Sequence, residues 1–208
     1  MLHRFSHIIL GIVLFLGTMP CFAAKTNSSA EARKLFDKVY NLVFGPEGST
    51  LHYKVNLIGI YKTEGTIIYK GKKLKYEEKR FCSWNNGSVS YDVDKDKKTV
   101  SLFSSDNPNK DKYLSKFKYN PDDYTYSVKA VGDKYEITAH LKHAKFFGVR
   151  SMTAVADKQT LYPTALKVKV AILSATVEIS NFHPGGISDD VFNFPSSRFK
   201  SYKFKDCR

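Results

Sequence analysis

The sequence is poor in cysteine, tryptophan and acidic residues, and these shortages exclude several classes of protein. Its 208 residues include three cysteines and one tryptophan, and 20 Asp and Glu stand against 33 Lys and Arg. Three cysteines are too few for a disulfide-based scaffold. Because 42% of the residues are hydrophobic, the chain can bury a core, so a wholly disordered protein is excluded. The length fits one domain.

The sequence also has none of the short motifs that mark common catalytic or metal sites. It contains no Gly-x-Ser-x-Gly turn, no phosphate-binding loop and no Cys-x-x-Cys pair. His140 and His143 are three residues apart at the end of an expected strand, so their rings point to opposite faces. We therefore expect no enzyme activity, no metal site and no cofactor.

Residues 1–23 have the layout of a cleaved secretory signal peptide. Arg4 supplies the positive charge, residues 8–16 are almost wholly apolar, and cleavage is expected after Ala23 or Ala24. The apolar run is too short to span a bilayer. Lipidation at Cys21 is the alternative, but small residues do not precede this cysteine. Since Arg4 is the only charged residue in the segment, the remaining chain keeps a net charge of +12. We expect the periplasm as its location.

The basic excess favours an anionic lipid surface or an acidic partner over nucleic acid. The lysines are spread over expected strands and turns, with concentrations only at residues 70–75 and 198–208. An exported protein rarely meets nucleic acid, so no nucleic-acid partner is expected. Solubility is the alternative explanation for a diffuse positive surface.

One helix is predicted at the start of the exported chain. Ser28 and Glu31 have the spacing of a capping box, in which each side chain bonds the backbone of the other. Apolar residues then recur at helical spacing, and Gly45 followed by Pro46 ends the helix. The apolar stripe of this helix must pack on another element. Residues 113–117 have the pattern of a second, short helix.

After this helix the hydrophobic period changes to two, which is typical of strands. We count about nine to eleven short strands without helical crossovers, so the sheet should be antiparallel. Asn86-Gly87 predicts a tight hairpin turn, Gly65 a bulge, and Pro163 a strand that starts late or lies at an edge. The predicted fold is mainly β, a curved sheet or open barrel with a helix against its concave face.

In this order of elements the chain resembles the LolA family of outer-membrane lipoprotein carriers. The segments that carry the resemblance are residues 30–42, 64–69, 86–94, 160–164, 180–182 and 190–195. The resemblance implies an unclosed antiparallel β-barrel with a helical lid over an apolar cavity. It also implies acylated lipoproteins as cargo, an inner-membrane release complex, an outer-membrane acceptor and transient membrane contact. We expect a monomer, with a carrier domain over residues 24–197 and a basic tail over residues 198–208.

The candidate acyl-binding residues are apolar positions on the helix and strands, with ordinary core as the alternative for each. Each buried methylene contributes about 0.8 kcal/mol, so a partly covered apolar face can hold an acyl chain loosely. The candidates are Leu35, Phe36, Val39, Tyr53, Val55, Leu57, Ile67, Tyr69, Tyr76, Trp84, Val89, Tyr91 and Leu102.

The sequence departs from the family in two places. Well-known members hold the lid with an arginine from a lysine–arginine–proline turn, but here Lys72 and Lys73 are the candidates for that latch. The tail adds Cys207, which either pairs with Cys82 in a disulfide or leaves two free thiols. Two other functions stay open: a glycan-binding protein that uses exposed aromatic residues such as Trp84 and Tyr124, and an envelope-complex subunit that uses the basic tail.

Overall fold

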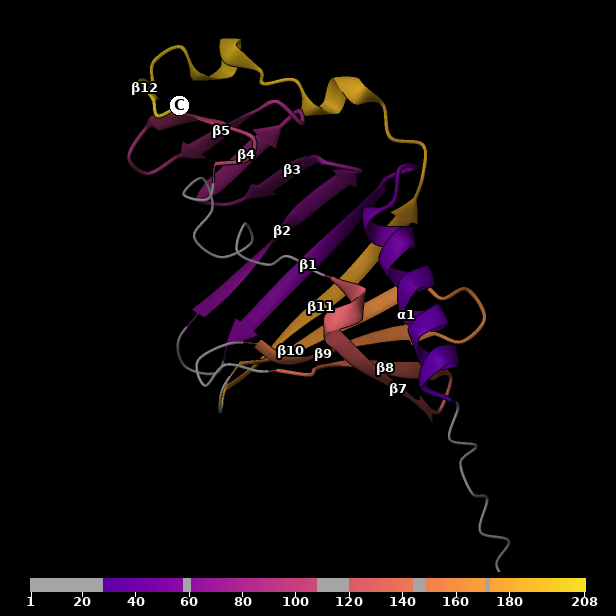
Figure 1. The fold of residues 1–208 in the computed structure, drawn as a ribbon. Helices are drawn as coiled ribbons and strands as arrows, with labels where there is room; N and C mark the ends of the chain where they lie inside the picture. Colours follow the sequence, from indigo (N-terminus) through magenta and orange to yellow (C-terminus); the bar gives the residue numbers. More distant parts are fainter. Residues whose placement is uncertain (1–27, 58–60, 108–119, 144–148, 171–172) are drawn as a thin grey trace, which may run out of the picture.

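One curved sheet of twelve strands forms the body of the protein (Figure 1). The computed structural model describes residues 28–57, 61–107, 120–143, 149–170 and 173–208. The elements in chain order are α1 (Ser29–Phe44), β1 (Ser49–Leu57), β2 (Tyr61–Lys70), β3 (Lys73–Glu78), β4 (Phe81–Asn85), β5 (Val89–Asp94), β6 (Thr99–Ser104), η1 (Pro121–Asp123), β7 (Tyr124–Val131), β8 (Lys134–Leu141), β9 (Val149–Asp157), β10 (Pro163–Val170), β11 (Leu173–Pro184), η2 (Asp189–Phe192), η3 (Ser196–Phe199) and β12 (Lys203–Asp206).

The strand order shows two antiparallel meanders joined at one seam. The order is β12-β6-β5-β4-β3-β2-β1-β11-β10-β9-β8-β7, so the seam is the pairing of β1 with β11. The sheet is not closed, which confirms the predicted mainly β, unclosed architecture. The twelfth strand exceeds the predicted nine to eleven because the basic tail itself forms β12, which pairs in parallel with β6.

Helix α1 begins and ends where the sequence predicts. The Glu31 amide donates to Ser28 Oγ at 3.3 Å, and the Ser28 amide donates to Glu31 Oε2 at 3.1 Å, which completes the capping box. At the other end the Gly45 amide donates to the Asn41 carbonyl at 2.9 Å. Both ends of the helix are therefore fixed by local hydrogen bonds.

The helix packs on one face of the sheet, which we call the concave face. Its first three turns contribute Ala32, Phe36 and Val39 to a core with buried residues of β7, β8 and β9. The Phe36 ring lies 5.7 Å from the ring of Tyr126 on β7. Its last turn contributes Val43 to a second core with residues of β1, β2 and β11. The helix therefore crosses from the β7 end of the sheet towards its centre (Figure 1).

Two details of strand register differ from the sequence-based expectation. Gly65 does not form a bulge, because its pairings with Tyr53 and Glu78 continue the register on both sides. The irregularity instead lies at the seam, where β11 places Asn181 and Phe182 opposite a single β1 residue. Asn181 has a φ of 50°, a conformation that asparagine tolerates well. This bulge changes the alternation, so Phe182 is buried in the core beside Val43.

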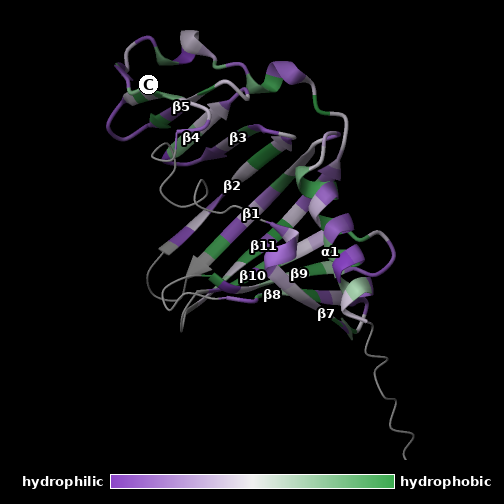
Figure 2. Ribbon diagram, viewed as in Figure 1, coloured by the Kyte–Doolittle hydropathy of each residue, from purple (hydrophilic) through white to green (hydrophobic). Residues whose placement is uncertain are grey.

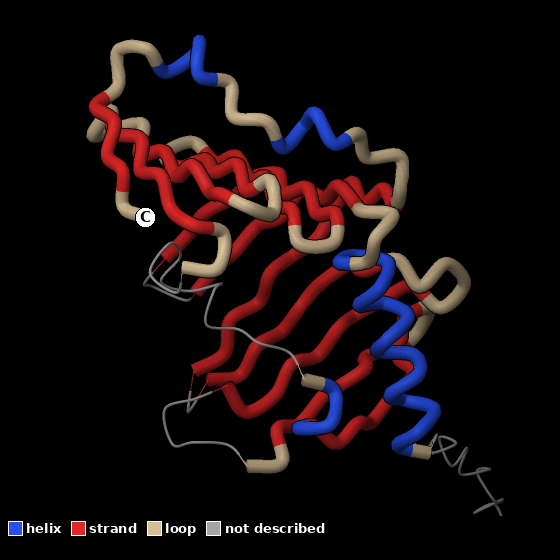
Figure 3. The backbone as a smooth tube through the Cα atoms, turned by 45° about the horizontal axis from the view of Figure 1, so that its top comes forward, coloured by secondary structure: helices blue, strands red, loops and turns tan. Residues whose placement is uncertain are grey.

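A third core lies on the opposite face of the sheet, which we call the convex face. Cys82, Trp84, Val93 and Val100 project from β4, β5 and β6 and pack against Phe199 of the C-terminal segment. This segment, residues 185–208, runs over the β3–β6 end of the sheet (Figures 1 and 3). Strand β4 is consequently buried on both faces.

Pro163 begins β10, as the late-start alternative predicts.

The expected signal peptide, residues 1–23, and the expected short helix at residues 113–117 lie outside the described residues. In the part of the chain that the structure describes, no helix combines the length and hydrophobicity needed to cross a membrane. The same residues contain no cluster of three or more His, Cys, Asp or Glu side chains suited to a metal ion.

Candidate functional site

The candidate site is the part of the concave face that lies between the two cores under α1. Paired positions on β1, β11 and β10 place Val55, Val177 and Leu166 in one row across the sheet. All three side chains are half-buried, unlike the fully buried residues beneath the helix. Hydrophobic residues recur along the central strands in Figure 2. The row is an apolar surface that α1 covers only in part.

Neighbouring residues widen this surface on both sides. Tyr53 pairs with Ile179 across the seam, and Tyr76 pairs with Ile67 between β3 and β2. Tyr53, Tyr76 and Ile179 are half-buried and pack against the core that contains Val43. We use the name apolar strip for Tyr53, Val55, Tyr76, Leu166, Val177 and Ile179.

A polar contact borders the apolar strip. The Tyr53 hydroxyl donates a hydrogen bond to Glu78 Oε1. Burial, followed by this hydrogen bond, holds the pKa of the Tyr53 phenol well above its usual range. Gly65 lies between the two strands that carry this pair, and a Cβ there would meet the Tyr53 hydroxyl at 3.1 Å and the Glu77 carbonyl at 2.6 Å. The glycine therefore makes room for the contact.

Beyond β3 the concave face becomes polar. Ser83 Oγ donates to Asp92 Oδ1 at 2.6 Å, and Ser90 Oγ donates to the same oxygen at 3.0 Å. Ser83 and Ser90 are buried. The concave face thus changes from an apolar surface at its centre to a hydrogen-bonded polar surface at the β4–β6 end.

The structure divides the candidate acyl-binding residues between two faces. On the concave side, Phe36, Val39 and Ile67 are fully buried core, Leu35 packs against that core, and Tyr69 contacts the Phe44 ring at 4.7 Å. Tyr53, Val55 and Tyr76 belong to the half-buried apolar strip. Leu57 ends β1, and only its backbone is described.

The other four candidates lie on the convex face and cannot share a surface with the apolar strip. Trp84, Val89, Tyr91 and Leu102 occupy positions of β4, β5 and β6 that alternate with the polar concave residues. Trp84 is only 2% exposed and Tyr124 only 7%, so neither offers the exposed ring that a glycan-binding function by these residues needs. The alternation of the sequence places these four positions on one face of the sheet. It does not tell whether that face is the one that α1 covers.

The lysine turn between β2 and β3 contacts both the helix end and the C-terminal segment. The Gly71 amide donates to the Gly45 carbonyl, directly after α1, at 3.1 Å. The side chain of Lys73 reaches Asp189 of η2 at 2.9 Å, beside Lys70 at 3.0 Å. Lys72 is exposed. The link from this turn to the helix is therefore a backbone hydrogen bond, and Lys73 holds the C-terminal segment.

Cys82 and Cys207 are both free thiols in the structure. Cys82 is fully buried under the C-terminal segment, whereas Cys207 is exposed after β12. Burial raises the pKa of the Cys82 thiol to about 11.

Sequence reasoning missed several residues that shape these surfaces. Glu78 gave no signal, because a strand carboxylate is common, and Gly65 predicted a bulge and not the space for a side-chain contact. Val177 and Ile179 were placed on a strand but not among the candidates. The aromatic series that covers the convex face was visible in the sequence as closely spaced rings at Phe194, Phe199, Tyr202 and Phe204.

Together these features define a class of fold: an unclosed, curved antiparallel sheet with one capped helix on its concave face. Comparison with solved structures supports this class. An uncharacterised conserved protein from Thermus thermophilus superposes with a TM-score of 0.56 at 8% identity, covering 85% of this chain and 99% of that one. No protein-family model matches the sequence, and the curated proteins contain no significant match.

Similar structures also include members of the family that the sequence resembles. One is a putative outer-membrane lipoprotein-sorting domain from Vibrio parahaemolyticus, with a TM-score of 0.45, 10% identity and coverage of 83% of this chain and 100% of that one. Another is a LolA superfamily protein from Nitrosomonas europaea, with a TM-score of 0.40, 7% identity and coverage of 79% and 98%. At such identities the likeness concerns the fold, so ligand choice has to be argued from the residues of this chain.

Proposed function

We propose that this protein is a periplasmic carrier that holds the acyl chains of lipoproteins against the apolar strip, without catalysis. The observation that carries the proposal is the half-buried row of Val55, Val177 and Leu166, which α1 leaves partly uncovered. The partners proposed with it are an inner-membrane release complex and an outer-membrane acceptor. We propose a monomer that contacts membranes transiently.

The energetics of an acyl chain suit a carrier that must also release its cargo. Burial of a methylene contributes about 0.8 kcal/mol, so a chain that places several methylenes on the apolar strip is held without polar contacts. Because the strip is half-buried before binding, the gain per methylene is smaller than in a closed cavity. The Tyr53 hydroxyl and one oxygen of the Glu78 carboxylate satisfy each other, which lowers the cost of placing hydrocarbon against this part of the strip.

Native mass spectrometry of residues 24–208 tests this proposal. The purified protein is mixed with a tripalmitoylated cysteinyl peptide, and the same peptide without acyl chains serves as the ligand control. We expect one acylated peptide per protein and no uptake of the unacylated form. A protein that neither retains acyl chains during purification nor takes up the acylated peptide contradicts the proposal.

A pair of neighbouring substitutions locates the binding surface. Val177 belongs to the apolar strip, whereas the adjacent Thr176 pairs with Lys167 on the convex side. We expect Val177→Asp to weaken uptake at least tenfold and Thr176→Asp to leave it unchanged. Val177→Thr preserves the shape of the side chain, so it keeps the test valid if the aspartate variant does not fold. Equal uptake by all three variants would place the acyl chains elsewhere.

A further inference from the structure

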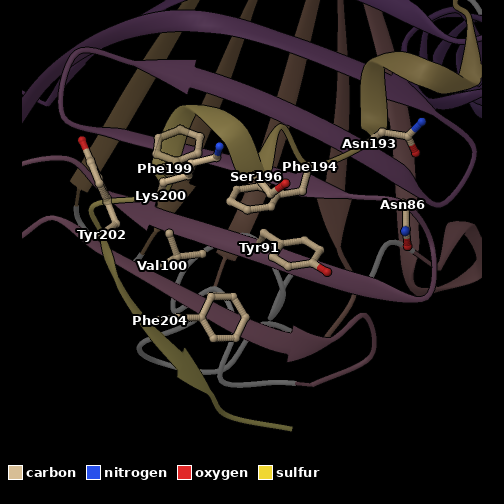
Figure 4. Close-up of a pocket in the computed structure, with 10 residues that line it drawn as sticks. All are labelled: Asn86, Tyr91, Val100, Asn193, Phe194, Ser196, Phe199, Lys200, Tyr202 and Phe204. Atoms are coloured by element: carbon tan, nitrogen blue, oxygen red, sulfur yellow. The ribbon is translucent and has the colours of Figure 1, made fainter.

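A pocket lies on the convex face, separate from the apolar strip on the concave face. A pocket of about 600 Å³ lies between the C-terminal segment and strands β5 and β6 (Figure 4). Pockets that bind small ligands commonly measure about 300–1,000 Å³. The lining residues are Asn86, Tyr91, Val100, Asn193, Phe194, Ser196, Phe199, Lys200, Tyr202 and Phe204.

Aromatic rings that pack against one another form the apolar part of this pocket. Tyr91 stacks on Phe194 with ring centroids 4.3 Å apart and planes at 5°. Phe194 stacks on Phe199 at 5.4 Å, and Tyr202 meets Phe199 edge-on at 5.1 Å. These mutual contacts fix the rings before any ligand arrives. Phe204 on β12 borders the same pocket with 54% of its surface exposed, so it has ring surface free for a ligand.

Two asparagines on one side of the pocket offer complementary hydrogen-bonding atoms (Figure 4). Asn86 Oδ1 accepts from the amides of Ser88 and Val89 at 3.0 Å each, so among the described residues its side-chain nitrogen is the group left for a ligand. Asn193 Nδ2 donates one of its two hydrogens to Asp190 Oδ1 at 3.4 Å, so among the described residues its side-chain oxygen is left as an acceptor. One donor and one acceptor match the carbonyl and the N–H of a secondary amide.

The charged side chain of the lining disfavours a cationic ligand. Lys200 is exposed at the pocket, and no carboxylate is among the described residues that line it. These features favour a neutral or acidic ligand that combines a secondary amide with apolar faces suited to aromatic rings. N-acetylated amino sugars meet these requirements, because a pyranose presents a flat face of C–H groups and the acetamido group supplies the amide. A peptide meets the amide requirement but has fewer such faces.

We propose that this pocket binds a short oligosaccharide of N-acetylated amino sugars. The ring face of one sugar lies on Phe204, and the acetamido group of another sugar of the same oligosaccharide bonds Asn86 and Asn193 at the other end of the pocket. The proposal goes beyond lipid carriage and does not depend on it, since the two surfaces lie on opposite faces of the sheet. A carrier with this second site would bind acyl chains on one face and a glycan on the other.

Tryptophan fluorescence and calorimetry test the proposal with triacetylchitotriose as the probe. Trp84 is the one tryptophan of the chain, and its ring lies 5.6 Å from Phe194 and 5.7 Å from Phe199, directly behind the pocket. We expect a saturable change in its emission with matching heat on titration. Cellotriose, which lacks acetamido groups, should bind at least tenfold more weakly.

Substitutions at exposed pocket residues assign the site. Phe204→Ala and Asn193→Ala should each weaken triacetylchitotriose binding at least tenfold, whereas Tyr162→Ala, at an exposed ring outside the pocket, should leave it unchanged. Three results would overturn the proposal: no heat with triacetylchitotriose, equal affinity for cellotriose, or displacement of the sugar by acetyl-trialanine amide. The acylated-peptide measurement on the same protein reports on the apolar strip independently.

Discussion

The Tyr53 hydroxyl donates to the Glu78 carboxylate from a strand two positions away in the sheet, with Gly65 on the strand between them. A side chain at residue 65 would occupy the space that this contact uses. The contact therefore joins three strands at the centre of the concave face.

Gly65→Ala should destabilise the fold by about 1–3 kcal/mol, the usual cost of inserting a methyl group into a packed site. The new Cβ would lie 2.6 Å from the Glu77 carbonyl oxygen, which is backbone and cannot turn aside. Urea denaturation measures the free energy of unfolding. Thr66→Ala, on the exposed side of the same strand, is the matched control. A Gly65→Ala protein as stable as the original would show that the strands can separate at no cost.

The two thiols should differ sharply in reactivity. Since burial raises the pKa of Cys82 to about 11, little thiolate is present at pH 8, and the side chain is also inaccessible. We expect a thiol reagent to modify one cysteine rapidly in folded residues 24–208 and both after unfolding. Cys207→Ser should abolish the rapid reaction. An unreduced protein with no reactive thiol even when unfolded would instead indicate a disulfide.

Asp189 should attach η2 to the sheet in a pH-dependent way. Hydrogen bonds from Lys73 and Lys70 lower the pKa of its carboxyl group. A lowered pKa in the folded state stabilises the fold above the unfolded value of about 3.9, and this contribution is lost as the pH falls through the lowered pKa.

Hydrogen exchange at the amides of η2 measures this effect. Asp189→Asn should exchange faster than the original protein at pH 6, and the two should converge near pH 2. Asp190→Asn is the control, because Asp190 accepts only from Asn193 among the described side chains. A difference that persists at the lowest pH would assign the effect to shape and not to charge.

Phe199→Ala should open the convex core. Phe199 is buried against Trp84, and truncation of a buried phenylalanine costs about 3–5 kcal/mol. Water would then reach the indole, so we expect a red shift of its emission together with a lower midpoint of thermal unfolding. Phe204→Ala removes an exposed ring of the same segment and should change both far less. An unshifted emission spectrum would mean that the segment does not shield Trp84.

Sequence features that act over a few neighbouring residues predicted the ends of the helix and the start of a strand. The capping box of Ser28 and Glu31, the glycine after the helix and the late start of β10 at Pro163 are all present, because each depends on neighbouring residues alone. The two faces of the sheet were harder to assign. Alternation along β4 separates Trp84 from Ser83, but both are buried, so burial alone could not show which of them faces α1.

The missing information was what covers each face. The tail looked like a basic extension, yet its aromatic residues cover the convex side of β4–β6 and β12 extends the sheet. The contacts of Phe199 and Phe194 with Trp84 join residues more than 100 positions apart, beyond the reach of any periodicity. The apolar strip was only partly predicted, because Val177 and Ile179 enter it through a seam formed by distant strands.

The seam between β1 and β11 and the pairing of β12 with β6 can form only after the C-terminal part of the chain is available. If the chain is exported from its N-terminus, as proposed, β1 to β6 cross the membrane first, and their hairpins pair within a short stretch of sequence. Strand β1 cannot gain its second neighbour until β11 has crossed, and β6 stays an open edge until the last residues arrive. Such distant pairings slow folding. A half-translocated chain would then expose two strand edges and the ring of Trp84 to any chaperone or neighbouring chain.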